Sequence, residues 1–224
     1  MDDRPNGFAR GSRAIGAVVL AAGAASRMGH RPKCLLELDG EPLVRRQCRA
    51  LLDAGLHEVV VVLGYYADRI ARALEGLPVA RVRNPQPDAG QAASLRLGLR
   101  ALVSEGVLVA LADQPLITPQ DIHDLLAAYR DRPTGTQLVQ PYTAGRPGNP
   151  VVFSAEVRRQ MLAHGAAQGG RQWQAAHPEA VHRWPTANPH YATDVDSPAD
   201  IEALALAGGP RLRWPADLVD GVCN

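Results

Sequence analysis

The stretch VVLAAGAASRMGHRPK, residues 18–33, decides the fold. Its start belongs to an apolar run over 16–22, which is typical of a strand buried on both faces. The rest is a loop of small residues that holds Arg27, Gly29 and Lys33 and no acidic residue. Glycine and alanine leave backbone N–H groups accessible to an anion. The stretch therefore predicts a phosphate-binding loop, or else a plain strand-to-helix loop with two solvated cations, and composition does not decide between them.

Two common nucleotide-binding motifs are missing from this loop. The Walker pattern GxxxxGK[ST] is absent, because the chain after Gly23 reads AASRMGHRPK. The dinucleotide pattern GxGxxG is absent as well, since Gly23, Gly29 and their neighbours do not fit it. A Rossmann oxidoreductase is disfavoured further by Gly64, which stands at the end of the second predicted strand where such enzymes carry an acidic residue.

Strand and helix patterns alternate through the first 130 residues. Strands are predicted at 16–22, 58–64, 79–82 and 107–113, and helices at 41–55, 66–76, 89–106 and 118–130. The last of these helices begins well, with Thr118 as N-cap and Pro119 at its first position. Such alternation predicts a Rossmann-like three-layer α/β/α fold around a twisted, mostly parallel sheet. Ligands of such sheets bind beyond the carboxyl ends of the strands, where the small-residue loop and Asp113 both lie.

The alternation loosens after residue 130. Strands are predicted at 136–142 and 150–154, a short helix at 155–165, a glycine-rich connection at 165–173, and a strand, a turn and a final helix within 188–208. We expect one domain over residues 15–207, with a smaller acceptor-binding portion at 132–192. Residues 1–14 and 208–224 are expected to be tails.

Composition and charge exclude several classes of protein. Lysine and arginine number 24 against 23 acidic residues, so the chain gives no reason to expect nucleic acid or a membrane surface as partner. Cys34, Cys48 and Cys223 form no CxxC pair, which argues against a disulfide framework or zinc knuckle and favours a reducing, cytoplasmic setting. Residues 1–14 lack the apolar centre of a signal peptide, and no apolar run approaches the ~20 residues that span a bilayer.

Five segments together resemble one family. The loop LAAGAASRMGHRPK resembles the LAAGxxxRMGxxxK signature of the molybdopterin nucleotidyltransferases, in the NTP-transferase superfamily. Further matches follow in the family order, at 84–99, 113–115, 145–153 and 194–201. The LAAG and DQP sequences are most similar to the molybdenum cofactor cytidylyltransferase branch. The resemblance implies a nucleotide-diphospho-sugar transferase-like fold and Mg²⁺-dependent transfer of CMP from CTP to molybdopterin cofactor, with pyrophosphate released.

The resemblance also implies roles for single residues in the triphosphate loop. Ala21, Ala22 and Gly23 would offer backbone contacts to the triphosphate. Arg27 would meet the β- and γ-phosphates. Lys33 would meet the α-phosphate and stabilise the charge that develops in the transition state.

Two aspartates and a later segment complete the implied site. Asp113 and Asp196 would hold Mg²⁺, although Asp113 also fits a turn or helix cap. The sequence DSPADI reads as a helix start too, with Ser197 as the cap. The base and ribose would be met by Gly90, Gln91 and Ser94, for which an ordinary helix start capped by Asp88 is the alternative.

Two departures from the family pattern leave the acceptor open. Asn149 stands where the family has a histidine, and Gln168 stands where an acidic residue is common. A guanylyltransferase that uses GTP, a sugar-phosphate nucleotidyltransferase and a non-catalytic cofactor-binding chaperone or adaptor remain alternatives. The adaptor is disfavoured because a pure binder needs no set of metal carboxylates and phosphate cations. A client molybdoenzyme or its chaperone is the protein partner that the family implies.

Overall fold

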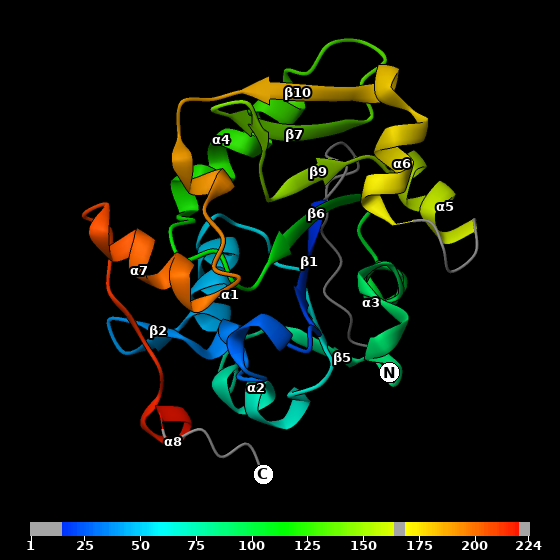
Figure 1. Cartoon of the computed structure of the whole chain (residues 1–224). Coiled ribbons are helices and arrows are strands. Elements are labelled where there is room, and N and C mark those ends of the chain that lie inside the picture. Colours follow the sequence, from blue (N-terminus) through cyan, green and yellow to red (C-terminus); the bar gives the residue numbers. More distant parts are fainter. Residues whose placement is uncertain (1–14, 164–168, 220–224) are drawn as a thin grey trace.

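One mixed sheet forms the centre of the computed structural model, which describes residues 15–163 and 169–219 (Figure 1). Its strands follow the order β10-β7-β9-β6-β1-β4-β5, and the short β8 pairs with β7. Their bounds are β1 Ile15–Ala21, β4 Val59–Leu63, β5 Ala80–Arg83, β6 Gly106–Leu111, β7 Leu138–Thr143, β8 Arg146–Pro147, β9 Val151–Phe153 and β10 Val181–Pro185. The expectations for residues 1–14, Gln168 and Cys223 lie outside the described residues.

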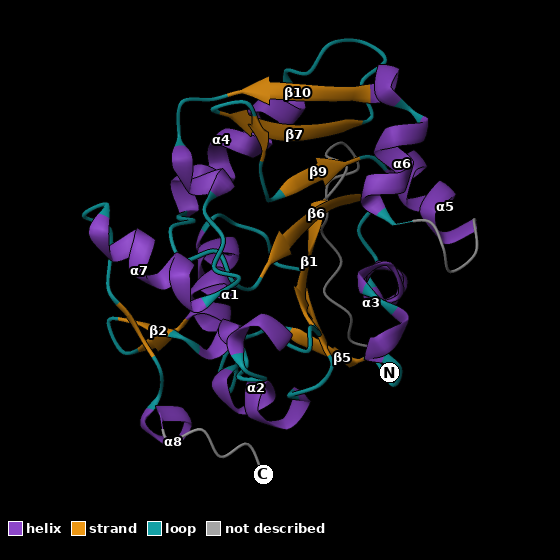
Figure 2. Cartoon of the chain, in the orientation of Figure 1, coloured by secondary structure: helices purple, strands orange, loops and turns teal. Residues whose placement is uncertain are grey.

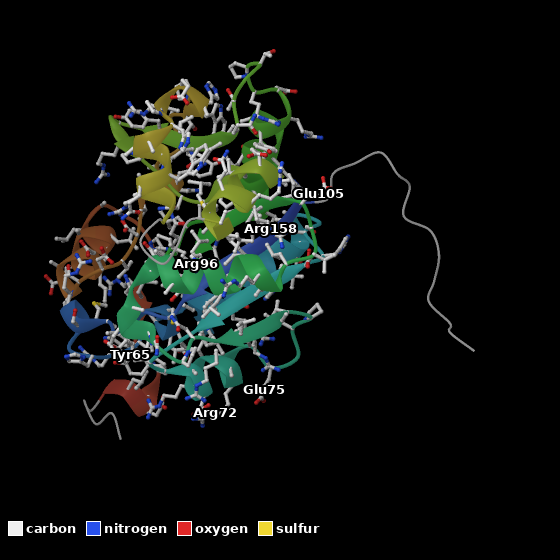
Figure 3. The ribbon with its side chains drawn as sticks, turned by 90° about the vertical axis from the view of Figure 1, so that its right-hand side faces the viewer. Tyr65, Arg72, Glu75, Arg96, Glu105 and Arg158 are labelled. Atoms are coloured by element: carbon white, nitrogen blue, oxygen red, sulfur yellow. The ribbon has the colours of Figure 1, made fainter. Side chains whose placement is uncertain are left out.

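Most neighbouring strands run parallel, as the alternation of strands and helices predicted. β1 pairs in parallel with β4 and β6, β4 with β5, and β10 with β7. β9 is antiparallel to both of its neighbours. The carboxyl ends of β1, β4, β5 and β6 therefore meet at one edge of the sheet. Tyr65, which follows β4, and Glu105, which precedes β6, accordingly lie at opposite ends of the molecule (Figure 3).

Helices cover both faces of the sheet and complete the three predicted layers (Figure 2). One face carries α1 Leu43–Asp53, α2 Ala67–Ala73 and α4 Pro119–Arg130, and the other carries α3 Gln91–Ala101, α5 Ala155–Ala163 and α6 Gly170–Ala176. Alternate residues of β1 enter the two cores, with Ala17 and Val19 toward the first face and Val18 toward the second. A continuous apolar strand is thus explained by burial on both sides.

The end of the chain packs against a second, smaller sheet. This sheet contains β2 Glu37–Leu38, β3 Glu41–Pro42 and β11 Leu212–Arg213, and two helices flank β11 in the chain, α7 Pro198–Leu206 and α8 Ala216–Val219. Leu212 is buried with Met28 and Leu36 in a third apolar cluster. The Trp214 ring lies 4.5 Å from the guanidinium carbon of Arg31. The described part of segment 208–224 therefore supports the loop that follows β1.

Several elements differ from the sequence predictions, including three between residues 165 and 208. Strand β10 was not predicted, because its residues are only partly buried and include a histidine and an arginine. Helix α6 begins within the expected glycine-rich connection, since its glycines stand at the helix start and do not interrupt it. In place of the strand expected within 188–208, the chain forms the 3₁₀ turn η5 (Pro189–Ala192) before α7. Among the helices of the described residues, none has the length and apolar character needed to cross a bilayer.

Candidate active site

Four charged residues from three distant segments meet at the carboxyl edge of the sheet. Lys33 Nζ contacts the carboxylates of both Asp113 and Asp196. Arg27 Nη2 donates to Asp196 Oδ2 at 2.8 Å. Asp113 follows β6, Asp196 precedes α7, and both cations lie in the loop after β1. The structure therefore brings together all four of the charged residues that the sequence singled out.

Backbone contacts hold the two aspartates side by side. The Val195 amide donates to the Asp113 carbonyl at 3.1 Å, which fixes the segment before α7 against the end of β6. Ser197 is the N-cap residue of α7, and its amide and that of Asp196 both donate to Asp200 Oδ2, at 2.7 and 2.9 Å. Asp200 and Ser197 thus satisfy the helix start, and the Asp196 carboxylate points to the cations instead.

Burial and charge shift the pKa values of this cluster in different directions. Burial raises the pKa of Asp113, and the adjacent Lys33 offsets only part of that effect. Burial alone would raise the pKa of Asp196, but Lys33 and then Arg27 hold it below its ordinary value. For Lys33, burial alone would lower the pKa, and Asp113 and Asp196 outweigh it. Lys33 is therefore a stable cation between two carboxylates.

The same cluster fits a divalent cation. Asp113 Oδ1 is buried and has no hydrogen-bond partner among the described residues. A buried oxygen of this kind is costly unless something binds it, and a carboxylate oxygen is the ligand that Mg²⁺ prefers. The described part of the chain holds no group of three His, Cys, Asp or Glu side chains suited to a metal. Asp113 and Asp196 would thus hold the cation together with phosphate oxygens and water, as Mg²⁺ is commonly held.

The loop after β1 has an unusual backbone conformation. Ala25, Gly29 and His30 have φ values of 51°, 63° and 57°, in the left-handed region. Each non-glycine residue there costs roughly 1–2 kcal/mol. Between them the 3₁₀ turn η1 (Ser26–Met28) buries Met28 and leaves Arg27 exposed. The packing of the Met28 side chain under the loop therefore directs the Arg27 side chain outward.

The residues predicted to meet the nucleotide backbone or base lie in two places. Ala21 and Ala22 are buried where β1 ends, and Gly23 is exposed at the start of the loop. Gly90 and Gln91 line a solvent-accessible cavity of about 990 Å³ on the α3 and α6 side of the sheet. Gly90 is the N-cap of α3 and has a φ of 88°, which favours glycine.

Ser94 and Asp88 require corrections to the predicted roles. The Ser94 side chain is buried and accepts a hydrogen bond from Asn84 Nδ2 at 3.0 Å, so its hydroxyl is committed to the interior. Asp88 does not cap α3, because Gly90 holds that position. The Asp88 carboxylate instead accepts a hydrogen bond from the Tyr65 hydroxyl.

The cavity has an apolar floor and a polar rim without carboxylates among its described lining residues. The floor contains Leu20, Val109, Leu111, Leu138, Val151 and Phe153. Amide and guanidinium side chains also line it, those of Gln91, Gln140, Asn149, Gln172, Gln174, Arg171 and Arg183. This combination suits an anionic molecule with a hydrogen-bonding edge. Asn149, one of the departures from the family pattern, lies in this lining.

Sequence reasoning missed two polar residues beside the site. Gln114 Nε2 donates to the carbonyls of Asn149 and Tyr191, both at 3.1 Å, and so ties the turn after β6 to the 132–192 portion. The DQP sequence contained this signal, since a buried side-chain amide next to Asp113 has to find hydrogen-bond partners. The Tyr66 hydroxyl contacts carbonyls of the loop after β1, and nothing in the sequence pattern indicates it.

Several known proteins are similar to this chain in fold and in sequence. The sequence profile of the MobA-like NTP transferase domain matches residues 17–181. A nucleotidyl transferase from Methanothermobacter thermautotroptrophicus has a structure that superposes with a TM-score of 0.73 and 26% identity, over 86% of this chain and 96% of that one. The predicted nucleotidyltransferase fold is confirmed by this likeness.

Two curated relatives carry different names. A nicotine blue oxidoreductase of Paenarthrobacter nicotinovorans is 34% identical over 146 residues, which are 63% of this chain and 71% of the relative. A probable molybdenum cofactor guanylyltransferase of Natronomonas pharaonis is 35% identical over 103 residues, 46% of this chain. The match spans about half of that relative, 51% of its length. With the matched profile and the shared fold, the chain is a nucleotidyltransferase that belongs to the family of MobA-like NTP transferase domains.

Proposed function

We propose that this enzyme transfers CMP from CTP to a molybdopterin-type acceptor, with Mg²⁺ bound by Asp113 and Asp196. The observation that carries the proposal is the contact cluster of Lys33 and Arg27 with these two aspartates. Family membership supplies the nucleoside triphosphate substrate. The sequence resemblance to the cytidylyltransferase branch, and a relative named for the molybdenum cofactor, support the choice of acceptor.

In an in-line transfer at the α-phosphorus, the protein would mainly position the acceptor and the triphosphate. A bond forms between an acceptor phosphate oxygen and the α-phosphorus, the bond from that phosphorus to the bridging oxygen breaks, and pyrophosphate leaves. Such a step needs alignment and neutralised charge more than a protein nucleophile. Bound Mg²⁺ would relieve part of the negative charge on the phosphates. Lys33 would stabilise charge at the α-phosphate, and Arg27 would hold the β- and γ-phosphates.

The nucleotide and the acceptor would occupy adjoining places. The backbone of Ala22 and of the exposed Gly23 would follow the triphosphate, with Ala21 at the strand end below it. Gly90 and Gln91 would meet the base and ribose at one end of the cavity. The acceptor would lie farther along the cavity, its phosphate toward Arg171 and its ring edge toward the carboxamides. An asparagine side chain at the position of the family's histidine both donates and accepts hydrogen bonds.

The two described cysteines support a cytoplasmic location and a structural role. Cys34 and Cys48 are free and buried. Burial raises the pKa of each thiol to about 12, which leaves both unreactive at neutral pH.

A client molybdoenzyme or its chaperone would receive the product.

A pyrophosphate-release assay tests the proposal directly. The protein is mixed with molybdopterin cofactor, Mg²⁺ and each of CTP, GTP, UTP and ATP in turn. We expect turnover with CTP, and an Asp113→Asn protein should lose it. Turnover with GTP alone would overturn the proposed CMP transfer and indicate guanylyl transfer. No turnover with any nucleotide, together with thermal stabilisation by CTP, would indicate the non-catalytic adaptor.

A second candidate, an oxidoreductase activity, rests on the name of one relative, and the absent GxGxxG motif argues against it. It is tested in the same preparation by following the oxidation of NADH and NADPH with an added electron acceptor. Oxidation of either cofactor without any nucleotidyl transfer would select this candidate.

A further inference from the structure

The loop after β4 lies between two loops that the proposed function assigns to the nucleotide. β4 stands between β1 and β5 in the sheet, and all three strands run parallel. Their following loops are therefore neighbours at the carboxyl edge. The middle loop begins with Gly64 and two consecutive tyrosines, Tyr65 and Tyr66.

The Tyr66 hydroxyl contacts both arms of the loop after β1. It lies 2.5 Å from the His30 carbonyl oxygen and 3.2 Å from that of Ala24. These two carbonyls stand on either side of η1, which carries Arg27. A single phenolic hydrogen shared between them closes the loop across its base.

Close approach of the two backbones makes this contact feasible. A Cβ atom at Gly64 would lie 2.3 Å from the Ala22 carbonyl oxygen, so only glycine lets the loops touch there. Two residues later, Tyr66 is the N-cap residue of α2, and its ring packs on the first apolar core. The hydroxyl is thus presented from a helix anchored to the core.

The loop after β1 has a conformation that benefits from such support. Ala25 and His30 are left-handed, and within the loop the Met28 and His30 amides both donate to the Ala25 carbonyl, at 2.9 and 3.1 Å. Non-glycine residues leave the left-handed region readily unless their surroundings hold them. The Tyr66 hydroxyl adds a bond from outside the loop to one of these residues.

We propose that Tyr66 is a positioning residue, whose hydroxyl sets the shape of the triphosphate loop before nucleotide binds. This inference rests on the proposed nucleotide-binding role of that loop. Preorganisation lowers the ordering cost of binding, so loss of the hydroxyl should weaken nucleotide affinity. The exposed Tyr65 hydroxyl donates to the Asp88 carboxylate, ahead of Gly90, and its loss should weaken nucleotide affinity less.

A Tyr66→Phe variant tests the proposal, because it keeps the ring and removes only the hydroxyl. Calorimetry with CTP and Mg²⁺ should give a Kd about fivefold higher than that of the parent, the effect of one hydrogen bond. KM for CTP should rise similarly, with kcat changed less than twofold. The nucleotide-free Tm should stay within about 2 °C, and the Met28 and His30 amides should exchange with deuterium faster.

Tyr129→Phe is the matched control, since this tyrosine lies near the end of α4 with Arg132 against its ring. It should leave CTP affinity and exchange in residues 25–31 unchanged. Equal CTP affinity and equal loop exchange in Tyr66→Phe and the parent would overturn the proposal. So would a fall in Tm that accounts for the lost affinity. If the parent itself binds no nucleoside triphosphate, the proposed function fails, and the exchange rates still decide whether Tyr66 holds the loop.

Discussion

The Asp113 carboxylate is placed at some cost in stability, as its proposed role as a metal ligand would require. Asp113 is buried, has a raised pKa and keeps one oxygen without a partner among the described residues. Its other oxygen contacts Lys33, which Asp196 also neutralises. Buried charge that is only partly paired contributes little to folding. Catalysis and stability should therefore separate at this residue.

Asp113→Asn should abolish most nucleotidyl transfer and leave the fold intact. We expect activity to fall by at least about 100-fold, the scale found when one group that stabilises transition-state charge is removed. The free energy of unfolding should change by less than about 1 kcal/mol, because Lys33 keeps its contact with Asp196. Activity is measured by pyrophosphate release and stability by urea unfolding. As a control, Asp68→Asn removes an exposed carboxylate that pairs with Arg83, and both measurements should match the parent.

Residues of the candidate site were predictable from the sequence to different degrees. Lys33 and Asp196 lie 163 positions apart, and only the ordered family segments indicated that they meet. Spacing alone left Arg27 and Lys33 equally compatible with a plain loop. The bond between Ser94 and Asn84 and the contacts of Tyr66 could not be predicted, because hydroxyl directions depend on packing between segments that the sequence pattern does not relate.

At the scale of elements, two helix ends are secured by side chains from other parts of the chain. The start of α4 contains a capping box between Thr118 and Asp121, and Thr118 was predicted as its cap. The Asp121 carboxylate also accepts hydrogen bonds from Asn188 Nδ2 at 2.6 Å and His190 Nδ1 at 2.9 Å. One buried carboxylate thus joins α4 to the turn η5.

The stability contributed by Asp121 should depend on pH. Burial alone would raise its pKa, but hydrogen bonds from His190 and Thr118 hold the pKa below its ordinary value. A depressed folded-state pKa stabilises the protein above the unfolded-state pKa of about 3.9, and this stabilisation is lost as pH falls through the folded-state pKa. Asp121→Asn should cost about 2 kcal/mol at pH 7. In urea unfolding, its difference from the parent should shrink below about pH 4.

A matched aspartate on the same helix checks this interpretation. Asp124 is exposed and accepts a hydrogen bond from Gln120 at 2.8 Å. Asp124→Asn should change the free energy of unfolding by no more than about 0.5 kcal/mol at any pH. A pH-independent loss in Asp121→Asn would show that the lost contacts are steric and not ionic.

The end of α3 offers a second test at this scale. The Arg158 guanidinium donates to the carbonyls of Leu99, Leu102 and Ser104, which end or follow α3. It lies near Glu105, at the end of the molecule opposite Tyr65 (Figure 3). Arg158→Ala should cost about 2–3 kcal/mol in urea unfolding, because buried carbonyls lose a charged donor. Arg159→Ala, which removes an exposed pair with Glu156, should cost less than about 0.5 kcal/mol and serves as the control.

Strands buried in the sheet were predictable, whereas of its two edge strands β5 was predicted and β10 was not. β1, β4 and β6 read as continuous apolar runs because both of their faces are covered. β10 pairs with only one strand and is half-buried, so its sequence carries no such run. β11 is a two-residue strand whose Leu212 pairs with Leu38 of β2, 174 positions earlier in the chain. Pairing over that distance follows from tertiary packing and leaves no local pattern.

At the scale of the whole molecule, three apolar clusters stabilise different parts of the described structure. Two of them lie on the two faces of the sheet and hold its helices. The third contains Met28, which follows Arg27, and Val195, which precedes Asp196, together with Leu212 near the end of the chain. The C-terminal segment therefore packs under residues that adjoin the charged cluster, and damage to it should reach the candidate active site.

Leu212→Ala tests this coupling between the chain's end and the site. Truncation of a buried leucine should cost about 2–3 kcal/mol of unfolding free energy through lost burial and the cavity left behind. Because Met28 and Val195 belong to the same cluster, Arg27 and Asp196 should lose their fixed positions, and the Kd for CTP should rise about threefold to tenfold. Urea unfolding and calorimetry measure the two effects. Leu206→Ala, at a leucine that is 87% exposed, should leave both unchanged. A destabilised Leu212→Ala protein that binds CTP as tightly as the parent would mean that the third cluster supports the fold without shaping the site.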